Sequence, residues 1–346
     1  MQSASGQAAS AGAASLRWGI LSTADIARRK VIPGLRRAAR SEVVAIGSRS
    51  LPVASRVAEE LGIPRAHGSY EALLADADVD AVYVPLPNHL HATWAIAAAR
   101  AGKHVLCEKP LAMTSADAER MVAASEDAGV VLMEAFMYRH HPSWVAARRL
   151  VAEGRIGRLM AVTSWFSYFN DDPANIRNMP DAGGGALYDI GCYSVNLSRM
   201  LFGAEPDRVS GAVHRDELSG TDAVTAGILE FAGGLSVFGC STRSEDDQRV
   251  DIYGTAGRIS IEIPFNIPPD RPTRIMVIAG GDPPVAPAVE TIELPTTDPY
   301  AAEAEAFIAT VLDGAPHPLP PADAVANLRV IERLFASAGA ATRAAG

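Results

Sequence analysis

Short apolar runs alternate with longer amphipathic segments over the first 138 residues of the chain. The runs are apolar on consecutive positions without polar alternation, which is typical of strands buried on both faces. Five such runs are present, at 16–21, 42–48, 80–86, 103–108 and 130–135. Amphipathic helices are predicted between them, at 51–62, 88–102 and 115–129, and each ends at a glycine, a residue favoured at helix C-caps. This alternation predicts an α/β fold whose residues 16–138 form a Rossmann-type domain with a doubly wound parallel sheet.

The pattern changes after residue 138. A helix is predicted over 142–153, and the segment 159–169 then begins to alternate apolar and polar residues. Two helices, over 299–313 and 321–339, close the chain. Between these elements, Gly-containing turns favour hairpins among strands predicted at 224–231, 234–241, 249–255, 257–263 and 273–279. We therefore expect residues 139–346 to form an α+β domain with a large, mostly antiparallel sheet that has helices on one face.

Composition and charge narrow the class of protein. The chain has 346 residues, 48% of them hydrophobic, which suffices for two domains with full cores. Its formal net charge of -9, without any basic block, argues against binding to nucleic acid or to an anionic membrane surface. No apolar run is long enough for a membrane span.

The cysteines and the first residues bear on location. Cys107, Cys192 and Cys240 are widely scattered, so neither a disulfide framework nor a cysteine zinc site is expected, and a reducing compartment fits. Residues 1–15 are rich in Ala, Ser, Gly and Gln and lack the regions of a signal peptide. We expect a disordered tail over residues 1–15 and a cytoplasmic protein.

The first predicted strand runs into a helix through RWGILSTADIARR, residues 17–29. A dinucleotide-binding loop belongs at this place, and its usual pattern is G-x-G-x-x-G. Here the glycine positions hold Ser22, Ala24 and Ala27, whose small side chains still allow a close backbone approach to a pyrophosphate. Asp25 would cap the helix, and it would repel phosphate if it pointed inward. From these residues alone, a nucleotide loop and a plain capped helix both remain open.

The turn after the second predicted strand carries Ser48 and Arg49 and no acidic residue. NAD sites usually place Asp or Glu there to bind the ribose 2′-hydroxyl, whereas sites for a 2′-phosphate use Arg. The pair therefore favours NADP(H) over NAD(H). A solvated surface arginine is the alternative interpretation.

Further polar residues follow the other apolar runs, at the edge where parallel sheets bind ligands. Glu108 ends one run and Lys109 follows it, so both could lie near a nicotinamide, although such a pair is often only a surface feature. Glu134 and Arg139, at the end of the last run and beyond it, could face the same cleft. The adjacent histidines at 140–141 have no third ligand at metal spacing, so we predict no metal site.

A second candidate cluster lies in GGGALYDIGCY, residues 183–193. Its glycines allow backbone to approach a ligand closely, and Asp189 and Tyr193 are four apart, on one face of the predicted helix. A phenol has a pKa of about 10, and a nearby ammonium such as that of Lys109 would lower it toward the range of a useful base. Asp189 would then bind a substrate hydroxyl or orient Lys109. A buried hydrogen-bonded pair that only stabilises the core is the alternative.

Together, AVYVPLPNHLH, VLCEKPLA and GGGALYDIGCY resemble the glucose–fructose oxidoreductase, inositol dehydrogenase and MocA-type oxidoreductase family. The resemblance covers nearly the whole chain from Leu16. The combination of Lys109, Asp189 and Tyr193 is similar to the branch that holds NADP-linked xylose dehydrogenases, dimeric dihydrodiol dehydrogenase and sugar 3-ketoreductases. It implies an NADP(H)-dependent oxidoreductase that transfers hydride between nicotinamide and a secondary alcohol or hemiacetal, or its carbonyl, of a sugar or cyclic polyol.

The resemblance also implies roles for individual residues. Lys109 and Tyr193 would transfer the proton, Asp189 would complete the catalytic group, and these three with Arg139 would contact the substrate. The second domain would bind substrate and mediate oligomerisation. The implied cofactor-binding residues are Ser22, Thr23, Ala24, Ile26, Ser48, Arg49, Leu86, Pro87, Asn88, His91, Glu108, Lys109, Glu134 and Arg177.

Other functions on the same scaffold remain open at this stage. They are a non-catalytic cofactor-binding sensor, an oxidoreductase with tightly bound NADP that cycles between two sugars, and an enzyme for a trans-dihydrodiol. A homodimer or homotetramer is expected through the open face of the second sheet. Trp165, Phe166, Tyr168 and Phe169 could stack on a sugar ring, but we favour a subunit interface for them.

Overall fold

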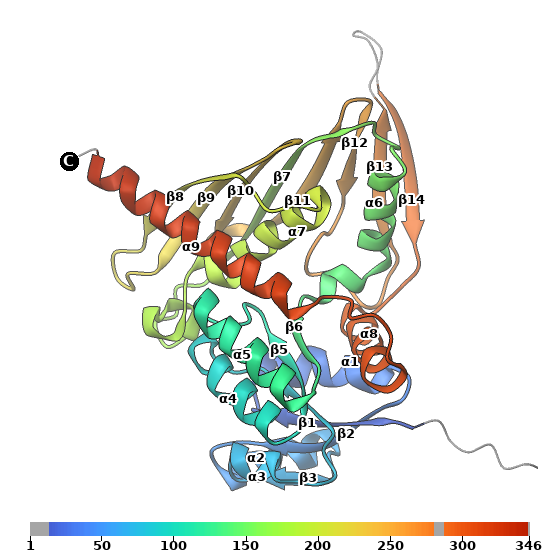
Figure 1. The fold of residues 1–346 in the computed structure, drawn as a ribbon, viewed down its shortest axis with the longest axis vertical. Coiled ribbons are helices and arrows are strands. Elements are labelled where there is room, and N and C mark those ends of the chain that lie inside the picture. Colours follow the sequence, from blue (N-terminus) through green and yellow to red (C-terminus); the bar gives the residue numbers. More distant parts are fainter. Residues whose placement is uncertain (1–13, 280–286, 345–346) are drawn as a thin grey trace, which may run out of the picture.

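The computed structural model describes residues 14–279 and 287–344, which build a parallel and a mostly antiparallel sheet with helices (Figure 1). The tail expected over residues 1–15 lies outside the described residues, apart from its last two. Among the described helices, none combines the length and the apolar character that a membrane crossing requires.

The first sheet has six parallel strands in the order β3-β2-β1-β4-β5-β6. Strand order reverses beside β1, and ligands bind in parallel α/β sheets at the carboxyl ends of the strands on either side of such a reversal. The strands are β1 (Leu16–Leu21), β2 (Ser41–Gly47), β3 (Arg65–His67), β4 (Ala81–Val84), β5 (His104–Glu108) and β6 (Leu132–Ala135).

Helices on both faces connect these strands. Gly62 and Gly129 end two of them in the left-handed conformation, with φ of 59° and 64°, as the sequence predicts. Thr114 begins α5 by accepting a hydrogen bond from the Asp117 amide at 3.1 Å. The helices are π-helix η1 (Ala27–Val31), α1 (Ile32–Arg37), α2 (Leu51–Leu61), α3 (Tyr70–Leu74), α4 (Asn88–Arg100) and α5 (Ser115–Ala128).

The second sheet has eight strands in the order β14-β13-β12-β11-β7-β10-β9-β8. Only β7 and β10 pair in parallel; every other pair is antiparallel. The strands are β7 (Leu159–Phe169), β8 (Arg208–Arg215), β9 (Asp222–Phe231), β10 (Gly234–Ser241), β11 (Arg243–Gly254), β12 (Gly257–Ile261), β13 (Thr273–Ala279) and β14 (Ala288–Leu294).

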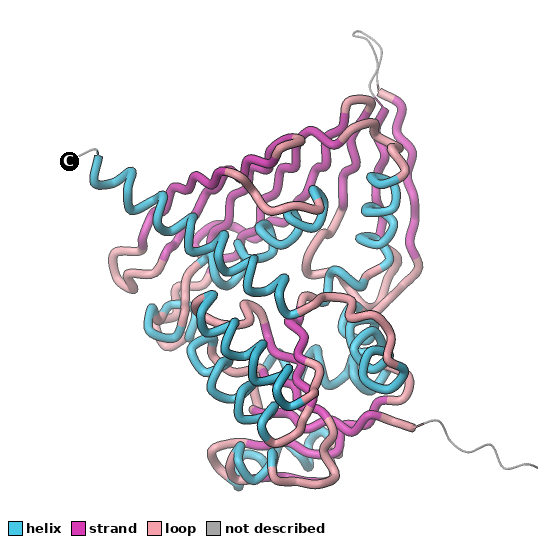
Figure 2. The backbone as a smooth tube through the Cα atoms, in the orientation of Figure 1, coloured by secondary structure: helices cyan, strands magenta, loops and turns pink. Residues whose placement is uncertain are grey.

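Helices α6 (Pro142–Ala152), α7 (Cys192–Phe202) and α9 (Pro321–Ala344) lie on one face of this sheet (Figure 2). Short helical turns η2 (Met137–His140), η3 (Ile176–Asn178), η4 (Pro180–Ala182) and η5 (Leu187–Gly191) complete this part. Together with the parallel sheet, this arrangement confirms the predicted fold class.

Helix α8 (Pro299–Asp313) follows the second sheet in sequence but packs back onto the first. The Phe307 ring lies 5.1 Å from that of Trp18 on β1, centroid to centroid. An ion pair of 2.5 Å between Arg37 and Asp298 fixes the start of α8 beside the end of α1. The late helix therefore closes one wall of the space between the two sheets.

Three strands were not predicted from the sequence: β3, β8 and β14. All three are edge strands of their sheets. An edge strand is short or partly solvated, so it need not carry a run of apolar residues. Strand β14 is exposed at five of its seven positions, and the apolar pattern used for the central strands is accordingly absent there.

Candidate active site

A cavity of about 750 Å³ lies between the two sheets, at the carboxyl edge of the parallel one. Segments that follow β1, β4 and β5 form its Rossmann side, which consists of Ala24, Asp25, Ile26, Pro85, Leu86, Asn88, Glu108 and Lys109. Its second-sheet side comes from the end of β7, the segment up to α7, and the segment after β12. That side includes Phe166, Tyr168, Phe169, Asn170, Asn175, Arg177, Asp189, Tyr193 and Asn266.

The loop after β1 makes its turn without a glycine at the first position of the nucleotide-binding pattern. Ser22, at the first glycine position, has a φ of 149°, in the region that favours glycine. Its hydroxyl accepts a hydrogen bond from the Ala24 amide at 3.0 Å, which stabilises the turn. Asp25 is mostly exposed and pairs with Arg28 and Arg29 of its own helix at 3.8 and 3.7 Å. The loop thus keeps the tight turn of a nucleotide loop, and the Asp25 charge is partly neutralised.

Glu108 is held in place at the end of β5. The Tyr83 hydroxyl donates a hydrogen bond to its Oε1 at 2.6 Å, and the Lys109 amide donates to its Oε2 at 3.2 Å. Burial raises the pKa of the Glu108 carboxyl above its ordinary value, although Lys109 opposes this shift. The carboxyl group therefore faces the cavity in a fixed orientation.

Lys109 crosses the cavity to reach the opposite side. Its Nζ donates to the backbone oxygen of Asp189 at 2.5 Å and lies 3.3 Å from Asp189 Oδ1. Burial lowers the pKa of Lys109, but the Asp189 carboxylate more than offsets this, so the pKa is raised above its ordinary value. The amine is therefore held as an ammonium at neutral pH.

Asp189 is the centre of a wider network. Besides Lys109, it accepts a hydrogen bond from the Tyr168 hydroxyl at 2.5 Å and from Arg177 Nε at 3.0 Å, both at Oδ2. Burial raises the pKa of Asp189, but Lys109 and Arg177 together outweigh burial, and the pKa lies well below its usual range. Asp189 is therefore a carboxylate, and it fixes two cations and one phenol around a single point.

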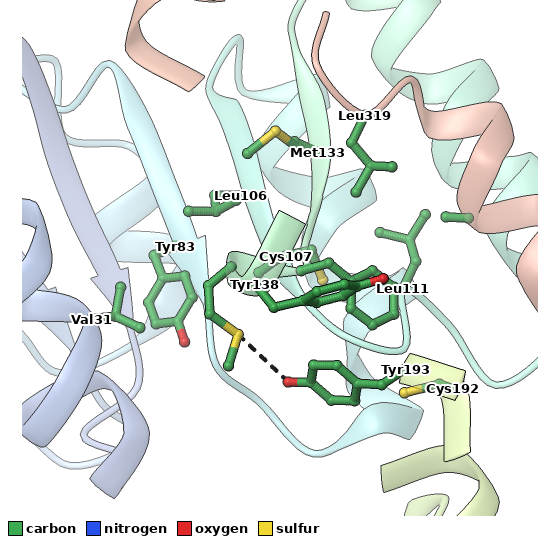
Figure 3. Close-up of a cluster of buried hydrophobic side chains, with 14 of the residues drawn as sticks. Val31, Tyr83, Leu106, Cys107, Leu111, Met133, Tyr138, Cys192, Tyr193 and Leu319 are labelled. Carbon is green, nitrogen blue, oxygen red and sulfur yellow. Dashed lines mark hydrogen bonds between the residues drawn. The ribbon is translucent and has the colours of Figure 1, made fainter. Parts of the chain in front are cut away.

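Tyr193 is oriented differently from the sequence-based hypothesis. Lys109 Nζ lies over the face of the Tyr193 ring, 5.1 Å from its centroid, and it makes no hydrogen bond to the Tyr193 hydroxyl. The hydroxyl points to Met137 Sδ at 3.6 Å (Figure 3). Burial raises the pKa of Tyr193 well above its ordinary value, so the predicted lowering by an ammonium does not occur in this arrangement.

The triple glycine packs against the protein itself. Gly185 has a φ of 113°, and a Cβ there would lie 1.8 Å from Asp222 Oδ1. Asp222 accepts hydrogen bonds from the Leu187 amide at 2.6 Å and from Thr225 Oγ1 at 2.9 Å. Gly185 therefore leaves room for Asp222 to cap the turn that carries Asp189, whereas the sequence suggested that the glycines allow a close approach to a ligand. Only Gly183 also lines the cavity.

Other predicted residues lie outside the cavity. His91 is fully buried, and its two ring nitrogens lie 2.9 and 2.7 Å from the backbone oxygens of Pro110 and Leu86. His91 therefore links the segments that follow β4 and β5, and it does not line the cavity itself. Arg139 contacts Asn196 at 3.2 Å and Asp323 at 3.4 Å, so its guanidinium faces α9 and not the cavity.

Glu134 is also buried away from the cavity. Its Oε1 accepts a hydrogen bond from the Leu111 amide at 2.7 Å, while Oε2 has no partner among the described residues. Burial raises the pKa of Glu134 to about 8. Through its hydrogen bond to the Leu111 amide, Glu134 holds the segment just after Lys109 in place. Glu134 therefore supports the site without lining the cavity.

The remaining predicted residues flank the Rossmann side. Ser22, Thr23 and Pro87 adjoin cavity-lining residues without lining the cavity themselves. Ser48 and the exposed Arg49 follow β2 directly, next to the β1 loop in the sheet order. The Asn88 side chain donates to the Gly183 oxygen at 2.8 Å and so ties the two sides together.

Sequence reasoning missed Tyr168 as a site residue. Alternation along β7 would have provided part of the signal, because Phe166 and Tyr168 share a strand face and both line the cavity, whereas Trp165 does not. Phe169, at the end of β7, lines the cavity as well and does not follow this alternation. Tyr300, on α8, and Asn266 also line the cavity. Nothing local marks these two residues, because α8 and the segment after β12 are distant in sequence.

No group of three or more His, Cys, Asp or Glu residues is placed to hold a metal ion within residues 14–279 and 287–344.

Comparison with known proteins adds a second line of evidence. Residues 16–136 match the oxidoreductase family with an NAD-binding Rossmann fold, and residues 144–260 match the GFO/IDH/MocA C-terminal domain. The chain is 42% identical over 324 residues to the uncharacterized oxidoreductase ORF334 of Rhizobium meliloti, which covers 93% of this chain and 97% of that protein. It is 41% identical over 325 residues to D-xylose 1-dehydrogenase (NADP(+)) 2 of Haloferax volcanii, with the same coverage.

A solved structure of an NADP-bound ketoreductase has the same fold as this chain. KijD10, a 3-ketoreductase from Actinomadura kijaniata in complex with NADP and TDP-benzene, superposes with a TM-score of 0.86. Its sequence is 32% identical, and the match covers 93% of this chain and 98% of that one. These similarities confirm the expectation of an NAD(P)-dependent oxidoreductase. With both halves matched, the chain belongs to the GFO/IDH/MocA oxidoreductase family.

Proposed function

We propose that this protein transfers hydride between NADP(H) and a secondary alcohol or hemiacetal, or its carbonyl, of a sugar or cyclic polyol, with Lys109 exchanging the proton. The observation that carries this proposal is the contact between Lys109 Nζ and Asp189 inside the cavity. It sets a charged proton donor at the junction of the Rossmann side and the second-sheet side.

The residues of the Rossmann side fit a dinucleotide. The Ser22 turn and the following helix leave Ala24 and Ile26 on the cavity wall, where small and apolar side chains admit a pyrophosphate and a nicotinamide ring. Arg49 has no hydrogen bond or ion pair with any described residue, and it follows β2, the strand after which dinucleotide folds bind the ribose, so we assign it to the 2′-phosphate. Glu108 would hold the nicotinamide ribose. The NADP of the relatives supports the same choice of cofactor.

The chemistry divides between cofactor and protein. Bound NADP(H) would supply or accept the hydride at nicotinamide C4. When a carbonyl is reduced, the Lys109 ammonium donates a proton to the carbonyl oxygen. In the oxidation of an alcohol the neutral amine takes the proton, so oxidation accelerates as pH rises through the raised pKa of Lys109. Reduction shows the opposite dependence.

Asp189 and Tyr193 act through Lys109 in this proposal. The Asp189 carboxylate keeps Lys109 charged and fixes the direction of its side chain. Asp189 also lines the cavity, where it can accept a hydrogen bond from a substrate hydroxyl. The Tyr193 ring supports the ammonium from one face. A non-catalytic sensor would not need a buried ammonium held in contact with the cavity, and this observation favours an enzyme.

We also propose a homodimer or homotetramer and a cytoplasmic location. Ile228, Leu235 and Val237 are 40–42% exposed on neighbouring strands β9 and β10, and Val237 lies directly opposite Ile228. An exposed apolar patch of this kind is typical of a subunit interface. The three cysteines are free and buried, which fits a reducing compartment.

The proposal is tested with Lys109→Ala. We expect turnover of the best sugar substrate to fall by roughly 10²- to 10⁴-fold, because the proton donor is lost, while NADPH binding measured by fluorescence is kept. Lys30→Ala, at an exposed lysine of η1, is the matched control. Unchanged turnover in Lys109→Ala would remove Lys109 from the mechanism.

A further inference from the structure

The two oxygens of the Asp189 carboxylate are bonded unequally. Oδ2 accepts hydrogen bonds from the Tyr168 hydroxyl at 2.5 Å and from Arg177 Nε at 3.0 Å. Oδ1 has one hydrogen-bond partner in the part of the chain that the structure describes, Lys109 Nζ at 3.3 Å. Hydrogen bonds between an ammonium and a carboxylate are usually about 2.7–2.9 Å long, so this ion pair is loose. The carboxylate is therefore held mainly from the second-sheet side of the cavity.

Lys109 makes its shortest contact with an uncharged group. Its Nζ donates to the backbone oxygen of Asp189 at 2.5 Å. The face of the Tyr193 ring lies beside the ammonium, with its centroid 5.1 Å from Nζ. The Glu108 carboxyl accepts from the Tyr83 hydroxyl and from the Lys109 backbone amide, and not from Nζ. An ammonium has three N–H groups, so one of them remains for a substrate oxygen in the cavity.

The two donors on Asp189 Oδ2 differ in how firmly they are committed to it. Tyr168 belongs to β7, which lies between β10 and β11 in the interior of the second sheet. Burial and the neighbouring Asp189 raise the pKa of Tyr168 above its ordinary value, so its hydroxyl stays protonated and donates. Arg177 is bonded to Asp189 through Nε alone, its terminal nitrogens have no partner at any position that the structure describes, and its side chain is 43% exposed. The sheet therefore fixes the Tyr168 contact, whereas Arg177 can also reach a ligand.

The middle residue of the triple glycine seats the Arg177 segment. A Cβ on Gly184 would lie 2.5 Å from the backbone oxygen of Arg177. The same oxygen accepts a hydrogen bond from the Gly185 amide at 2.9 Å. The Asn175 side chain accepts a hydrogen bond from the Arg177 amide at 3.1 Å. The missing side chain at Gly184 therefore lets the Arg177 segment lie against the turn that carries Asp189.

Other titratable groups around Lys109 come from several elements. Burial raises the pKa values of Cys192 and Tyr193, both on α7, and lowers that of His91 on α4, so all three are uncharged near neutral pH. Two carboxyl groups and one guanidinium therefore set the charge around the amine. The complete set of side chains is Glu108, His91, Arg177, Asp189, Cys192 and Tyr193.

We propose that Tyr168 and Arg177 are positioning residues that hold the Asp189 carboxylate back from Lys109. Where a carboxylate and an ammonium form a tight pair, transfer of the ammonium proton to a substrate breaks that pair and is costly. Two donors on Oδ2 offset part of the carboxylate charge and keep Oδ1 at 3.3 Å from the amine, so the proton stays available. This inference rests on the proposed role of Lys109 and adds two residues that act through Asp189.

Tyr168→Phe tests this inference, because it deletes one donor and keeps the ring. With Oδ2 partly freed, the carboxylate should pair more closely with Lys109 and move the titration of the amine to higher pH. The titration is measured on the full chain without added ligand, from the rate at which an acylating reagent labels Lys109 at a series of pH values. Only the neutral amine reacts, so we expect labelling roughly 3-fold slower than in wild type at a fixed pH below the midpoint. The upper pH limb of alcohol oxidation should move in the same direction, opposite to Asp189→Asn.

Arg177→Met removes the second donor together with a positive charge. Burial lowers the pKa of Lys109 and Asp189 raises it, while Arg177 opposes that rise. We therefore expect labelling roughly 10-fold slower at the same pH, and slower still in the double variant. Tyr253→Phe is the matched control, because this tyrosine lies on β11 and its hydroxyl bonds no residue that the structure covers.

The direction of the shift decides the outcome. A labelling midpoint that moves to lower pH in Tyr168→Phe would overturn the inference, because Tyr168 would then direct the carboxylate toward Lys109. A midpoint that stays with that of Tyr253→Phe would overturn it as well, and would leave Tyr168 a purely structural role. The labelling needs no turnover, so it judges the positioning alone, whereas full activity of Lys109→Ala would overturn the proposed function.

Discussion

The two sides of the cavity are built in different ways. On the Rossmann side, each residue follows its own strand and is fixed by near neighbours: Ser22 by the Ala24 amide, and Glu108 by Tyr83. On the second-sheet side, one carboxylate, Asp189, organises Tyr168, Arg177 and Lys109. The first side is built from separate strand ends, whereas the second concentrates charge around one carboxylate.

Two buried carboxyl groups near the site illustrate the same difference. Asp189 stays ionised because two cations outweigh the cost of burial, and its pKa lies well below the usual range. Glu134 has a single hydrogen bond, to an amide, and burial raises its pKa to about 8. Two arginines, Arg199 and Arg139, also act on Glu134, but neither contacts it. Direct contact with cations, and not burial itself, therefore decides which of the two carries charge.

Asp189→Asn should have the largest effect of the further substitutions considered, because it removes the carboxylate that organises the second-sheet side of the cavity. We expect kcat/KM to fall by about 100-fold, as for the loss of a charged contact to the proton donor. The carboxylate raises the pKa of Lys109, so its loss should shift the pH profile of alcohol oxidation to lower pH. Asp181→Asn, at an exposed position before the triple glycine, is the control. A pH profile that stays in place would refute the proposed pairing.

On the Rossmann side, Arg49→Ala should affect one cofactor only. Loss of hydrogen bonds to the 2′-phosphate should weaken NADPH binding by roughly 10- to 50-fold and leave NADH binding nearly unchanged. Fluorescence titration with both cofactors measures this. Arg56→Ala, at an exposed arginine of α2, serves as control. Equal losses for NADPH and NADH would argue against a 2′-phosphate contact.

Tyr193→Phe should have a small effect on turnover, below about 5-fold, because the ring face that contacts Lys109 is kept. Tyr193→Leu removes that face and should cost more. Steady-state kinetics of the two variants decide between a ring that supports the ammonium and a hydroxyl that transfers the proton. A loss in Tyr193→Phe as large as that in Lys109→Ala would favour the hydroxyl.

Glu134→Gln should change turnover least, within about 2-fold, since Gln can still accept the Leu111 hydrogen bond. Its effect should lie in stability. The pKa of Glu134 rises from 4.5 to about 8 on folding, so the folded state holds a proton that the unfolded state releases. Wild-type stability should therefore decline as pH rises across that interval, by at most about 1.4 kcal/mol per pH unit.

Thermal unfolding of both proteins from pH 5 to pH 8 measures this effect. The stability of Glu134→Gln relative to wild type should grow steadily with pH. A difference that is independent of pH would mean that Glu134 is not protonated in the folded protein.

Sequence patterns located the central strands and the closing helix over 299–313 because those segments bury continuous apolar faces. They missed β8 and β14 because these lie at the edges of the second sheet, where partial solvation removes the apolar signal. At the site, Lys109 and Asp189 were both predicted. Tyr168 was assigned to a subunit interface because its partner in the site is 21 positions away in sequence.

The chain alone determined the class of fold, the family and the strand-end positions of Glu108 and Lys109, because strand periodicity and short motifs are local properties. Tertiary structure decided which groups meet. It turned Lys109 toward the Asp189 carboxylate and the face of Tyr193, and it left Arg139 and Glu134 outside the cavity. Protonation states follow from these distances and from burial, and both depend on segments that only folding brings together.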